Sequence, residues 1–485
     1  MKPLSICTTF FSHLKAVNVR YCHWKSNSHL AEALAGQTDL DVLIAQESRG
    51  LFETALLKYK FKKLISPPEK QFPGMEDYIG FDKDTGKLIH LHVHYKLIMG
   101  QKYIKNHHLP LENIILENLR ELNGVFVPIA ELELLILIIR ANMKLGFSTI
   151  TKSYIRTATL DYPEDILGEI RLLNQDCCKD ILKSQFSALR SLGLKEELFF
   201  AFIDDVQNDG LTRKSILAIR SHIFQTLKPY CRYGPVVSRW RAASVGFKKI
   251  RYIRKIFPAT KKTMATGGKV FALIGSDGSG KSSLNEELVK WMSWKVAVKK
   301  YYFGIPKGRI IIKYLSRISQ IFNRLAKVNL GRIITTIILK TSKRISAIRW
   351  LIIARERLRF YEDSKNIIKS GVVGFADRYP LAEFQSMGSP MDGPRIASEY
   401  GTQNKMSIKE ENYYSQIGLP TKAFVLRVEI DELLNRIDTT TPEVLQKKVD
   451  AIYSVQPSAK VDLVNGQRLP QEVLLDIKQR IWELL

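Results

Sequence analysis

The chain has 485 residues, of which 45% are hydrophobic and 25% charged, and this composition excludes a disordered, collagen-like or coiled-coil protein. At about 150 residues per domain, the length predicts roughly three domains. No apolar stretch approaches the roughly 20 residues that a transmembrane helix needs, and no signal peptide is evident. The five cysteines lack metal-ligand spacing, so we expect a reducing, cytoplasmic compartment.

The net charge of +26 is concentrated in two segments. Residues 228–270 contain twelve Lys or Arg and no acid, and residues 288–355 contain sixteen and no acid. Because apolar residues alternate with these bases, three interpretations are open. The segments could be helices packed on the protein with solvated bases, they could lie on an anionic membrane surface, or they could bind nucleic acid. The last is the least favoured, since no nucleic-acid-binding motif is present.

In chain order, residues 1–125 mix helices and strands, with alternating segments at 39–44 and 88–95 that predict strands. Residues 128–227 follow a helical pattern, and 228–268 form a basic connector. Residues 269–485 alternate strands with helices, which predicts a parallel sheet and an α/β fold class. The predicted strands of this last piece are 269–274, 371–376, 423–428 and 460–464, and its predicted helices include 281–291 and 470–485.

The segment Asp39-Leu-Asp41 places two carboxylates on one face of a predicted strand. Such a pair can hold two Mg²⁺ ions for phosphoryl or nucleotidyl transfer. Together with Trp24-Lys25 before it and His94-Tyr95-Lys96-Leu97 after it, this segment resembles an uncharacterised nucleotidyltransferase-like family over residues 1–125. The resemblance implies a mixed α/β domain with Asp39 and Asp41 as metal ligands.

That family uses a third carboxylate, and the matching position here is His92. Histidine is a softer ligand without negative charge, so it suits Mg²⁺ poorly. His90, His92 and His94 share a strand face and could hold a different metal or simply be partly buried, and Glu76 or Asp77 could supply the missing acid. The domain is therefore either a nucleotidyltransferase or a degenerate binding module.

The segment Gly275-Ser-Asp-Gly-Ser-Gly-Lys281-Ser282 fits G-x-x-x-x-G-K-[ST] and lies between a predicted strand and a predicted helix. In such a loop the backbone amides point at phosphate oxygens, the lysine reaches the β- and γ-phosphates, and the serine hydroxyl binds Mg²⁺. We therefore expect ATP and Mg²⁺ as cofactors. The expected nucleotide-binding residues are Gly275, Ser276, Asp277, Gly278, Ser279, Gly280, Lys281, Ser282 and Ser283.

Asp377-Arg378-Tyr379 follows the predicted strand 371–376, where an acid can hold Mg²⁺ and an arginine can contact a phosphoryl oxygen. A P-loop with aspartate at its third position, combined with D-R-Y, resembles the thymidylate kinase family over residues 269–485. The resemblance implies a P-loop kinase that transfers the γ-phosphate of ATP to a nucleoside monophosphate, dTMP or a related phosphorylated acceptor. It implies a homodimer as well, with Lys281, Asp377 and Arg378 as catalytic residues.

The same resemblance implies roles for further residues. Arg357 matches a substrate-contacting arginine, Lys307 or Arg309 would bind the acceptor phosphate, Arg436 would be a catalytic lid arginine, and Asp277 would face the acceptor sugar. From the residues alone, Arg357 could equally lie on a solvated helix face, and Arg436 could pair with Glu432 one helical turn earlier. The long basic and apolar stretch 310–355 departs from the family pattern.

Two other functions stay open at this point. The N-terminal domain could be the enzyme, a nucleotidyltransferase, with the P-loop domain as its nucleotide sensor. Alternatively the chain could be a membrane-associated protein of envelope glycan or lipid metabolism, peripheral to the inner face of the membrane.

Overall fold

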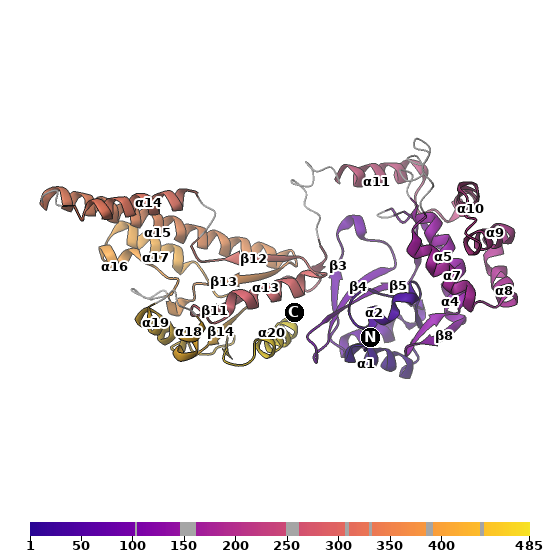
Figure 1. Ribbon diagram of the computed structural model, residues 1–485, viewed down its shortest axis with the longest axis horizontal. Coiled ribbons are helices and arrows are strands. Elements are labelled where there is room, and N and C mark those ends of the chain that lie inside the picture. The colour runs from indigo at the N-terminus through magenta and orange to yellow at the C-terminus, as the bar shows by residue number, and fades with distance from the viewer. Residues whose placement is uncertain are drawn as a thin grey trace. The chain divides into compact units, whose positions relative to one another are not determined.

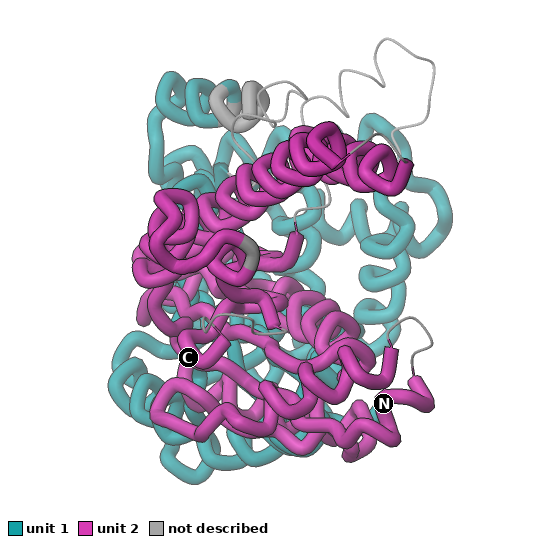
Figure 2. Tube along the Cα trace, turned by 90° about the vertical axis from the view of Figure 1, so that its left-hand side faces the viewer, with its two compact units in different colours: residues 1–261 teal, residues 262–485 magenta. Residues whose placement is uncertain are grey.

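The computed structural model describes residues 1–101, 104–145, 162–248, 261–305, 310–328, 332–384, 391–436 and 441–485. The chain forms two compact units, Met1–Lys261 (unit 1) and Lys262–Leu485 (unit 2), which Figure 2 colours separately. Within the described residues, no helix combines the length and the apolar character that crossing a bilayer would require.

Unit 1 contains a mixed sheet. β2 runs parallel to β5, whereas the other neighbouring pairs among its first five strands are antiparallel. In spatial order these strands are β1 (Tyr21–His23), β2 (Leu40–Ile44), β5 (Leu88–His94), β4 (Met75–Phe81) and β3 (Lys62–Ile65). The helices α1 (Ser5–Ala16), α2 (Leu30–Leu34) and α3 (Arg49–Lys58) contribute to an apolar core on this sheet, which includes Phe10, Phe52 and Leu91.

A bundle of helices completes unit 1 (Figure 1). α5 (Ala130–Lys144) is buried around almost its whole circumference, because it packs against the other helices and the sheet at once. One core contains Trp24 and Leu43 from the strand region together with Ile138, Phe199 and Ile223 from the helices. Residues 1–125 and 128–227 therefore share a core.

The other described α-helices of unit 1 are α4 (Glu112–Glu117), α7 (Glu164–Asp176), α8 (Lys179–Arg190), α9 (Glu196–Gln207), α10 (Arg213–Thr226) and α11 (Pro235–Lys248). Its other described strands are β6 (Leu97–Met99), β7 (His107–Leu109), β8 (Leu119–Leu122) and β9 (Val125–Pro128).

Unit 2 is built on a five-stranded, fully parallel sheet, which confirms the predicted α/β fold class. The strand order is β12 (Val298–Tyr302), β13 (Val373–Asp377), β11 (Val270–Gly275), β14 (Lys422–Arg427) and β15 (Val461–Asn465). Because all strands run the same way, the loops that follow them meet at one edge. The short strand β10 (Thr263–Met264) begins the unit, and its helices include α13 (Lys281–Ser293), α16 (Ile396–Tyr400), α17 (Lys405–Ser415), α18 (Ile430–Arg436), α19 (Pro442–Tyr453) and α20 (Pro470–Leu484).

The stretch between β12 and β13 forms a helical hairpin. α14 (Ile310–Leu325) lies along the first part of α15 (Arg332–Lys369), and the two project beyond the sheet of unit 2 (Figure 1). The later part of α15 packs against α17 and β13. One continuous helix therefore runs from the projecting hairpin along the sheet to the start of β13.

Candidate functional site

The glycine-rich loop connects the end of β11 to the start of α13. Gly278 and Gly280 each have φ near +80°, a left-handed conformation that side chains disfavour. This geometry lets the loop curl between Gly275 and Lys281 and brings the α13 N-terminus to the strand ends, where its free amides can bind an anion. Residues 275–283 thus run from the last residue of β11 through the loop into the first turn of α13, which is the strand–loop–helix arrangement that the motif requires.

Two of the predicted magnesium ligands lie together. The Ser282 hydroxyl donates a hydrogen bond of 3.2 Å to Oδ2 of Asp377, which ends the neighbouring strand β13. Asp377 is only 4% exposed, and its Oδ1 accepts no hydrogen bond from any residue in the described ranges. A buried carboxylate oxygen without a donor, next to a hydroxyl, is a donor set suited to Mg²⁺. The residues therefore fit the cation that the motif implies.

Lys281 is folded back onto its own loop. Its Nζ donates to the backbone carbonyl of Ser276 at 3.1 Å and lies 3.7 Å from Oδ1 of Asp277. Burial, and then the neighbouring positive charge of Arg378, lower the pKa of this lysine. The ammonium group thus already lies in the loop. A negatively charged phosphate oxygen would be a stronger hydrogen-bond acceptor for it than the Ser276 carbonyl.

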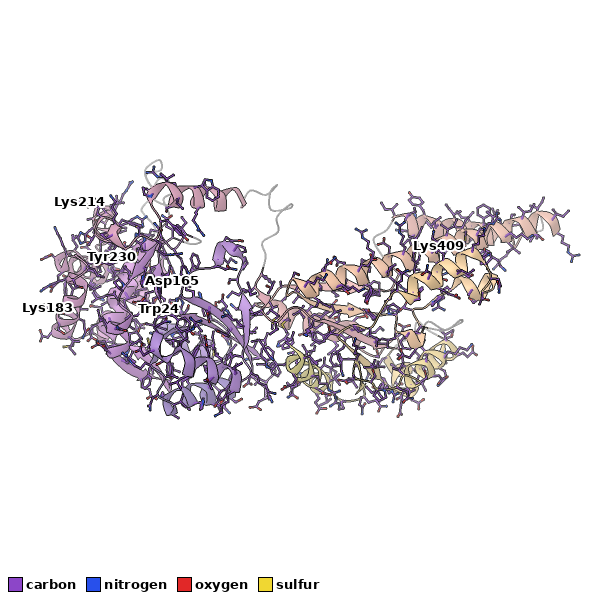
Figure 3. All side chains as sticks on the ribbon, turned by 180° about the vertical axis from the view of Figure 1, so that it is seen from behind. Trp24, Asp165, Lys183, Lys214, Tyr230 and Lys409 are labelled. Atoms are coloured by element: carbon purple, nitrogen blue, oxygen red, sulfur yellow. The ribbon has the colours of Figure 1, made fainter. Side chains whose placement is uncertain are left out.

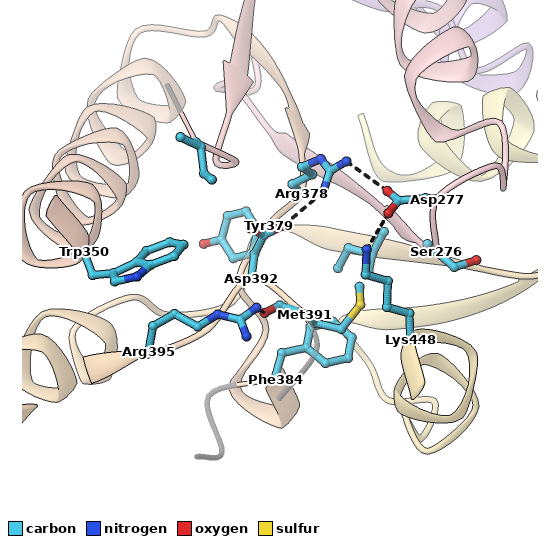
Figure 4. A pocket seen from close by; sticks show the side chains of 13 residues that line it. Ser276, Asp277, Trp350, Arg378, Tyr379, Phe384, Met391, Asp392, Arg395 and Lys448 are labelled. Atoms are coloured by element: carbon cyan, nitrogen blue, oxygen red, sulfur yellow. Dashed lines mark hydrogen bonds and ion pairs between the residues drawn. The ribbon is translucent and has the colours of Figure 1, made fainter. Parts of the chain in front are cut away.

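Asp277 is the centre of an ion-pair network in this loop (Figure 4). Its Oδ1 lies 3.0 Å from Nη2 of Arg378, and its Oδ2 lies 2.5 Å from Nζ of Lys448 on α19. Burial acts to raise the pKa of Asp277, but Lys448, Lys281 and Arg378 outweigh it, so the pKa is lowered. The carboxylate therefore holds two cations at the mouth of the loop.

A cavity of about 160 Å³ opens beside these residues. Acidic, basic and aromatic side chains converge on it: Asp392 and Arg395 from the segment before α16, and Trp350 from α15 (Figure 4). Its walls comprise Ile274, Gly275, Ser276, Asp277, Ile305, Trp350, Arg378, Tyr379, Phe384, Met391, Asp392, Arg395 and Lys448. A pocket that combines aromatic walls with several cations suits a small phosphorylated molecule with a flat ring.

Arg357 is buried rather than solvated, with 1% of its surface exposed. Its Nε donates to the carbonyl of Phe303 at 2.5 Å and its Nη2 to Oδ1 of Asp392 at 2.7 Å, while Nη1 donates to the Tyr414 hydroxyl. That hydroxyl donates in turn to the Gly393 carbonyl at 3.1 Å. Arg357 therefore anchors Asp392, which lines the pocket, instead of lining the pocket itself.

Other predicted residues stand apart from this group. Arg436 donates to Oε1 of Glu432 through Nε at 3.1 Å and Nη2 at 2.9 Å, the helical pairing that its spacing allows, and it does not line the cavity. Lys307 and Arg309 lie outside the described residues. Sequence reasoning assigned no role to Asp392 or Lys448, because only the fold brings these distant segments to the loop.

Unit 1 contains a second cluster of ionisable side chains around Asp41. Its Oδ1 lies 2.6 Å from Nζ of Lys25, 3.2 Å from Nδ1 of His92 and 3.3 Å from Nε2 of His94. Burial opposes ionisation of this carboxyl, but Lys25 and hydrogen bonds from the two histidines hold its pKa well below the usual range. Burial lowers the pKa of both histidines.

The neighbouring Asp39 is engaged as well. Nδ1 of His90 lies 2.9 Å from Oδ1 of Asp39, and its Nε2 lies 3.2 Å from Oδ1 of Asp77. Asp77 is therefore the third carboxylate of the cluster, whereas Glu76 pairs with Arg49 at 3.0 Å. Among the described residues, the ligand atoms of Asp41, His92 and His94 lie within 4.8 Å of one another. Because histidine or lysine contacts each aspartate, this donor set does not fit a pair of Mg²⁺ ions.

No protein-family model matches the chain. Two proteins of Escherichia coli K12 are similar to part of it: the uncharacterized ATP-binding protein YghR is 24% identical over 224 residues (44% of this chain, 87% of YghR), and the uncharacterized ATP-binding protein YghS is 29% identical over 176 residues (35% and 72%). Among solved structures, thymidylate kinase from Candida albicans is similar at 13% identity, with 45% of this chain and 90% of that chain covered and a TM-score of 0.28. Deoxyadenosine kinase from M. mycoides with bound dATP is similar at 11% identity, with 44% and 98% covered and a TM-score of 0.27.

Proposed function

We propose that unit 2 is a kinase that transfers the γ-phosphoryl group of ATP to a phosphorylated acceptor, with a nucleoside monophosphate such as dTMP as the first candidate. The observation that carries this proposal is Asp377, which lies beside the P-loop hydroxyl of Ser282 and has a buried oxygen that no described residue contacts by a hydrogen bond. The cavity next to it presents Arg378 and Lys448. The description of YghR and YghS as ATP-binding proteins supports ATP as the phosphoryl donor.

On the donor side, the amides of residues 275–283 and the ammonium of Lys281 would hold the β- and γ-phosphates. Ser282 and Asp377 would hold Mg²⁺, which when bound neutralises charge on the phosphate oxygens. An oxygen of the acceptor phosphate attacks the γ-phosphorus, the bond from that phosphorus to the β,γ-bridging oxygen breaks, and ADP leaves. The protein contributes positioning and charge neutralisation.

On the acceptor side, Arg378 and Lys448 are the cations that can turn from Asp277 to the incoming phosphate, since that carboxylate now holds both. Arg357 acts through Asp392, and Asp277 is left facing the sugar. We assign the further contacts with the acceptor phosphate to Lys307 or Arg309, and the role of lid arginine to Arg436. Arg436 can serve there only by leaving Glu432.

A screen for the acceptor tests this proposal. The full chain is incubated with Mg²⁺ and ATP labelled at the γ-phosphate, together with nucleoside monophosphates and, separately, phosphosugars. We expect label to move to at least one nucleoside monophosphate, with dTMP the first to be tested. Transfer to phosphosugars alone would keep the kinase but remove the nucleotide acceptor. No transfer to any acceptor would contradict the proposal.

The rival is nucleotidyl transfer by unit 1, with unit 2 as nucleotide sensor. The contacts of Asp39 with His90 and of Asp41 with Lys25 favour a binding role for unit 1 instead. The double variant Asp39→Ala and Asp41→Ala separates the two hypotheses when the screen is run with ATP labelled at the γ-phosphate and, in parallel, at the α-phosphate, because nucleotidyl transfer moves the α-phosphate and releases the γ-phosphate in pyrophosphate. We expect the variant to retain γ-phosphoryl transfer, whereas the rival requires the parent chain to transfer the α label and this variant to lose that transfer.

A further inference from the structure

Polar side chains take part in the contact between α14 and α15, and one of them, Ser342, is buried. Ser342 is 2% exposed, and its hydroxyl donates to Oδ1 of Asn323 at 2.7 Å and lies 3.0 Å from the hydroxyl of Ser319. Further along the contact, Nη1 of Arg349 donates to the hydroxyl of Ser316 at 3.2 Å. Two helices that pair in water normally turn their apolar faces toward each other. Here hydroxyl, amide and guanidinium groups occupy part of the contact between the two helices.

Many of the large apolar side chains of the hairpin lie on its outside. Ile310 is 72% exposed and Ile333 is 78% exposed, whereas Ile312 is buried. Large exposed apolar patches are rare on proteins that face only water. The exposed set is Ile310, Ile311, Tyr314, Ile318, Ile321 and Leu325 on α14, and Ile333, Ile334, Ile337, Leu339 and Ile348 on α15.

On α14 this apolar stripe is flanked by cations. The stripe runs through Tyr314, Ile318, Ile321 and Leu325, which are spaced three or four residues apart on one helix face. The exposed residues Lys313, Arg317 and Arg324 share an adjacent face, because they are spaced by four and seven residues. The sequence has no acid between Leu288 and Arg355, so no carboxylate within this stretch offsets its positive charge.

From this arrangement we infer that the α14–α15 hairpin docks on an anionic membrane surface, with its isoleucines in the acyl boundary and its lysines and arginines at the headgroups. An amphipathic helix with a basic polar face binds lipid in this way. A second copy of the chain fits the same face poorly, since it would bring two acid-free basic surfaces together. Nucleic acid would satisfy the cations but not the exposed isoleucines.

Vesicle co-sedimentation of the full chain tests the inference. We expect binding to vesicles of equal parts phosphatidylglycerol and phosphatidylcholine, weak binding to pure phosphatidylcholine, and a decrease as salt rises. The triple variant Lys313→Gln, Arg317→Gln and Arg324→Gln should bind on the order of a hundredfold more weakly, since each cation near an anionic surface contributes roughly fivefold. The matched control is Lys183→Gln, Lys214→Gln and Lys409→Gln, exposed lysines on other helices (Figure 3), and it should bind normally.

A second variant tests the apolar stripe. Ile318→Ser, Ile321→Ser and Leu325→Ser change exposed side chains, so folding should be retained, and we expect vesicle binding to be lost even at low salt. Normal binding by both hairpin variants would overturn the inference, as would equal binding to neutral vesicles. A change of oligomeric mass in these variants, without vesicle binding by the parent chain, would assign the face to a second copy instead. Lys281→Ala should still bind vesicles, so failure of this inference is distinguishable from failure of the proposed kinase activity.

Discussion

Replacement of Lys281 by alanine is expected to reduce the turnover number of γ-phosphoryl transfer by about a thousandfold, the scale of losing a preorganised charge that stabilises a transition state. The side chain is 6% exposed, and its ammonium lies within the curled loop, bonded to the Ser276 carbonyl. Alanine leaves the loop amides in place, so ATP can still bind while the developing charge on the β- and γ-phosphates loses its partner. The measurement is steady-state transfer of labelled phosphate to the acceptor found in the screen.

The matched control is Lys290→Ala, because Lys290 lies on the same helix, α13, with its side chain exposed. It should keep the turnover number of the parent chain. A turnover number for Lys281→Ala within a few-fold of the parent would remove the kinase proposal. An ATP-dependent rise in melting temperature, measured on both variants, shows whether alanine at position 281 has affected folding or nucleotide binding.

The P-loop half of the candidate site was predictable because its signal is local. The glycines, Lys281 and Ser282 follow one another in sequence, and the backbone turn that they make depends on the loop itself. Asp377 was predictable from its place after a buried apolar strand, since parallel strands deliver their ends to one edge. Four of the five sheet strands of unit 2, β11, β13, β14 and β15, were predicted from short, mainly apolar runs. The fifth, β12, was not predicted, because it carries the exposed Lys299 and Lys300.

The pocket beside the P-loop was less predictable because its contacts join distant segments. Nothing near Lys448 in the sequence indicates a pairing with Asp277, and Asp392 becomes a pocket residue only through Arg357 and Arg378. In unit 1, the strand β4 has no apolar alternation, because it is buried on both faces over much of its length. Asp77 on that strand therefore joined the Asp39–His90 cluster in a way that spacing alone did not specify.

The hairpin shows a different limit of sequence reasoning. Alternating bases and isoleucines over residues 310–355 are compatible with helices packed on a sheet, with a membrane surface and with nucleic acid. Which helix face is buried depends on the partner helix. Only the structure places Ser319 and Ser342 in the contact and leaves many of the isoleucines outside.

Replacement of Arg357 by methionine is expected to lower the free energy of unfolding by about 3 kcal/mol, the lower end of the cost of breaking a buried ion pair, because Asp392 is only part-buried and keeps Arg378 as a partner. Methionine keeps the aliphatic part of the side chain, but Asp392, the Phe303 carbonyl and the Tyr414 hydroxyl lose their shared donor. Calorimetry should show a melting temperature for unit 2 lower by about 10 °C, given roughly 2–4 °C per kcal/mol for a unit of this size.

The position of Asp392 makes this variant informative about function as well as stability. We expect the double variant Arg357→Met and Asp392→Asn to lose less stability than the two single changes predict together. The reason is that Asp392→Asn alone leaves the buried guanidinium without its carboxylate, whereas the double variant has neither charge. Arg359→Met, which changes an exposed arginine on the same helix, is the control and should have the melting temperature of the parent chain.

If Arg357→Met also had the melting temperature of the parent chain, the buried network would not support the pocket. If it were stable but bound the acceptor more weakly, Arg357 would contact the acceptor directly, as the resemblance to thymidylate kinases implied.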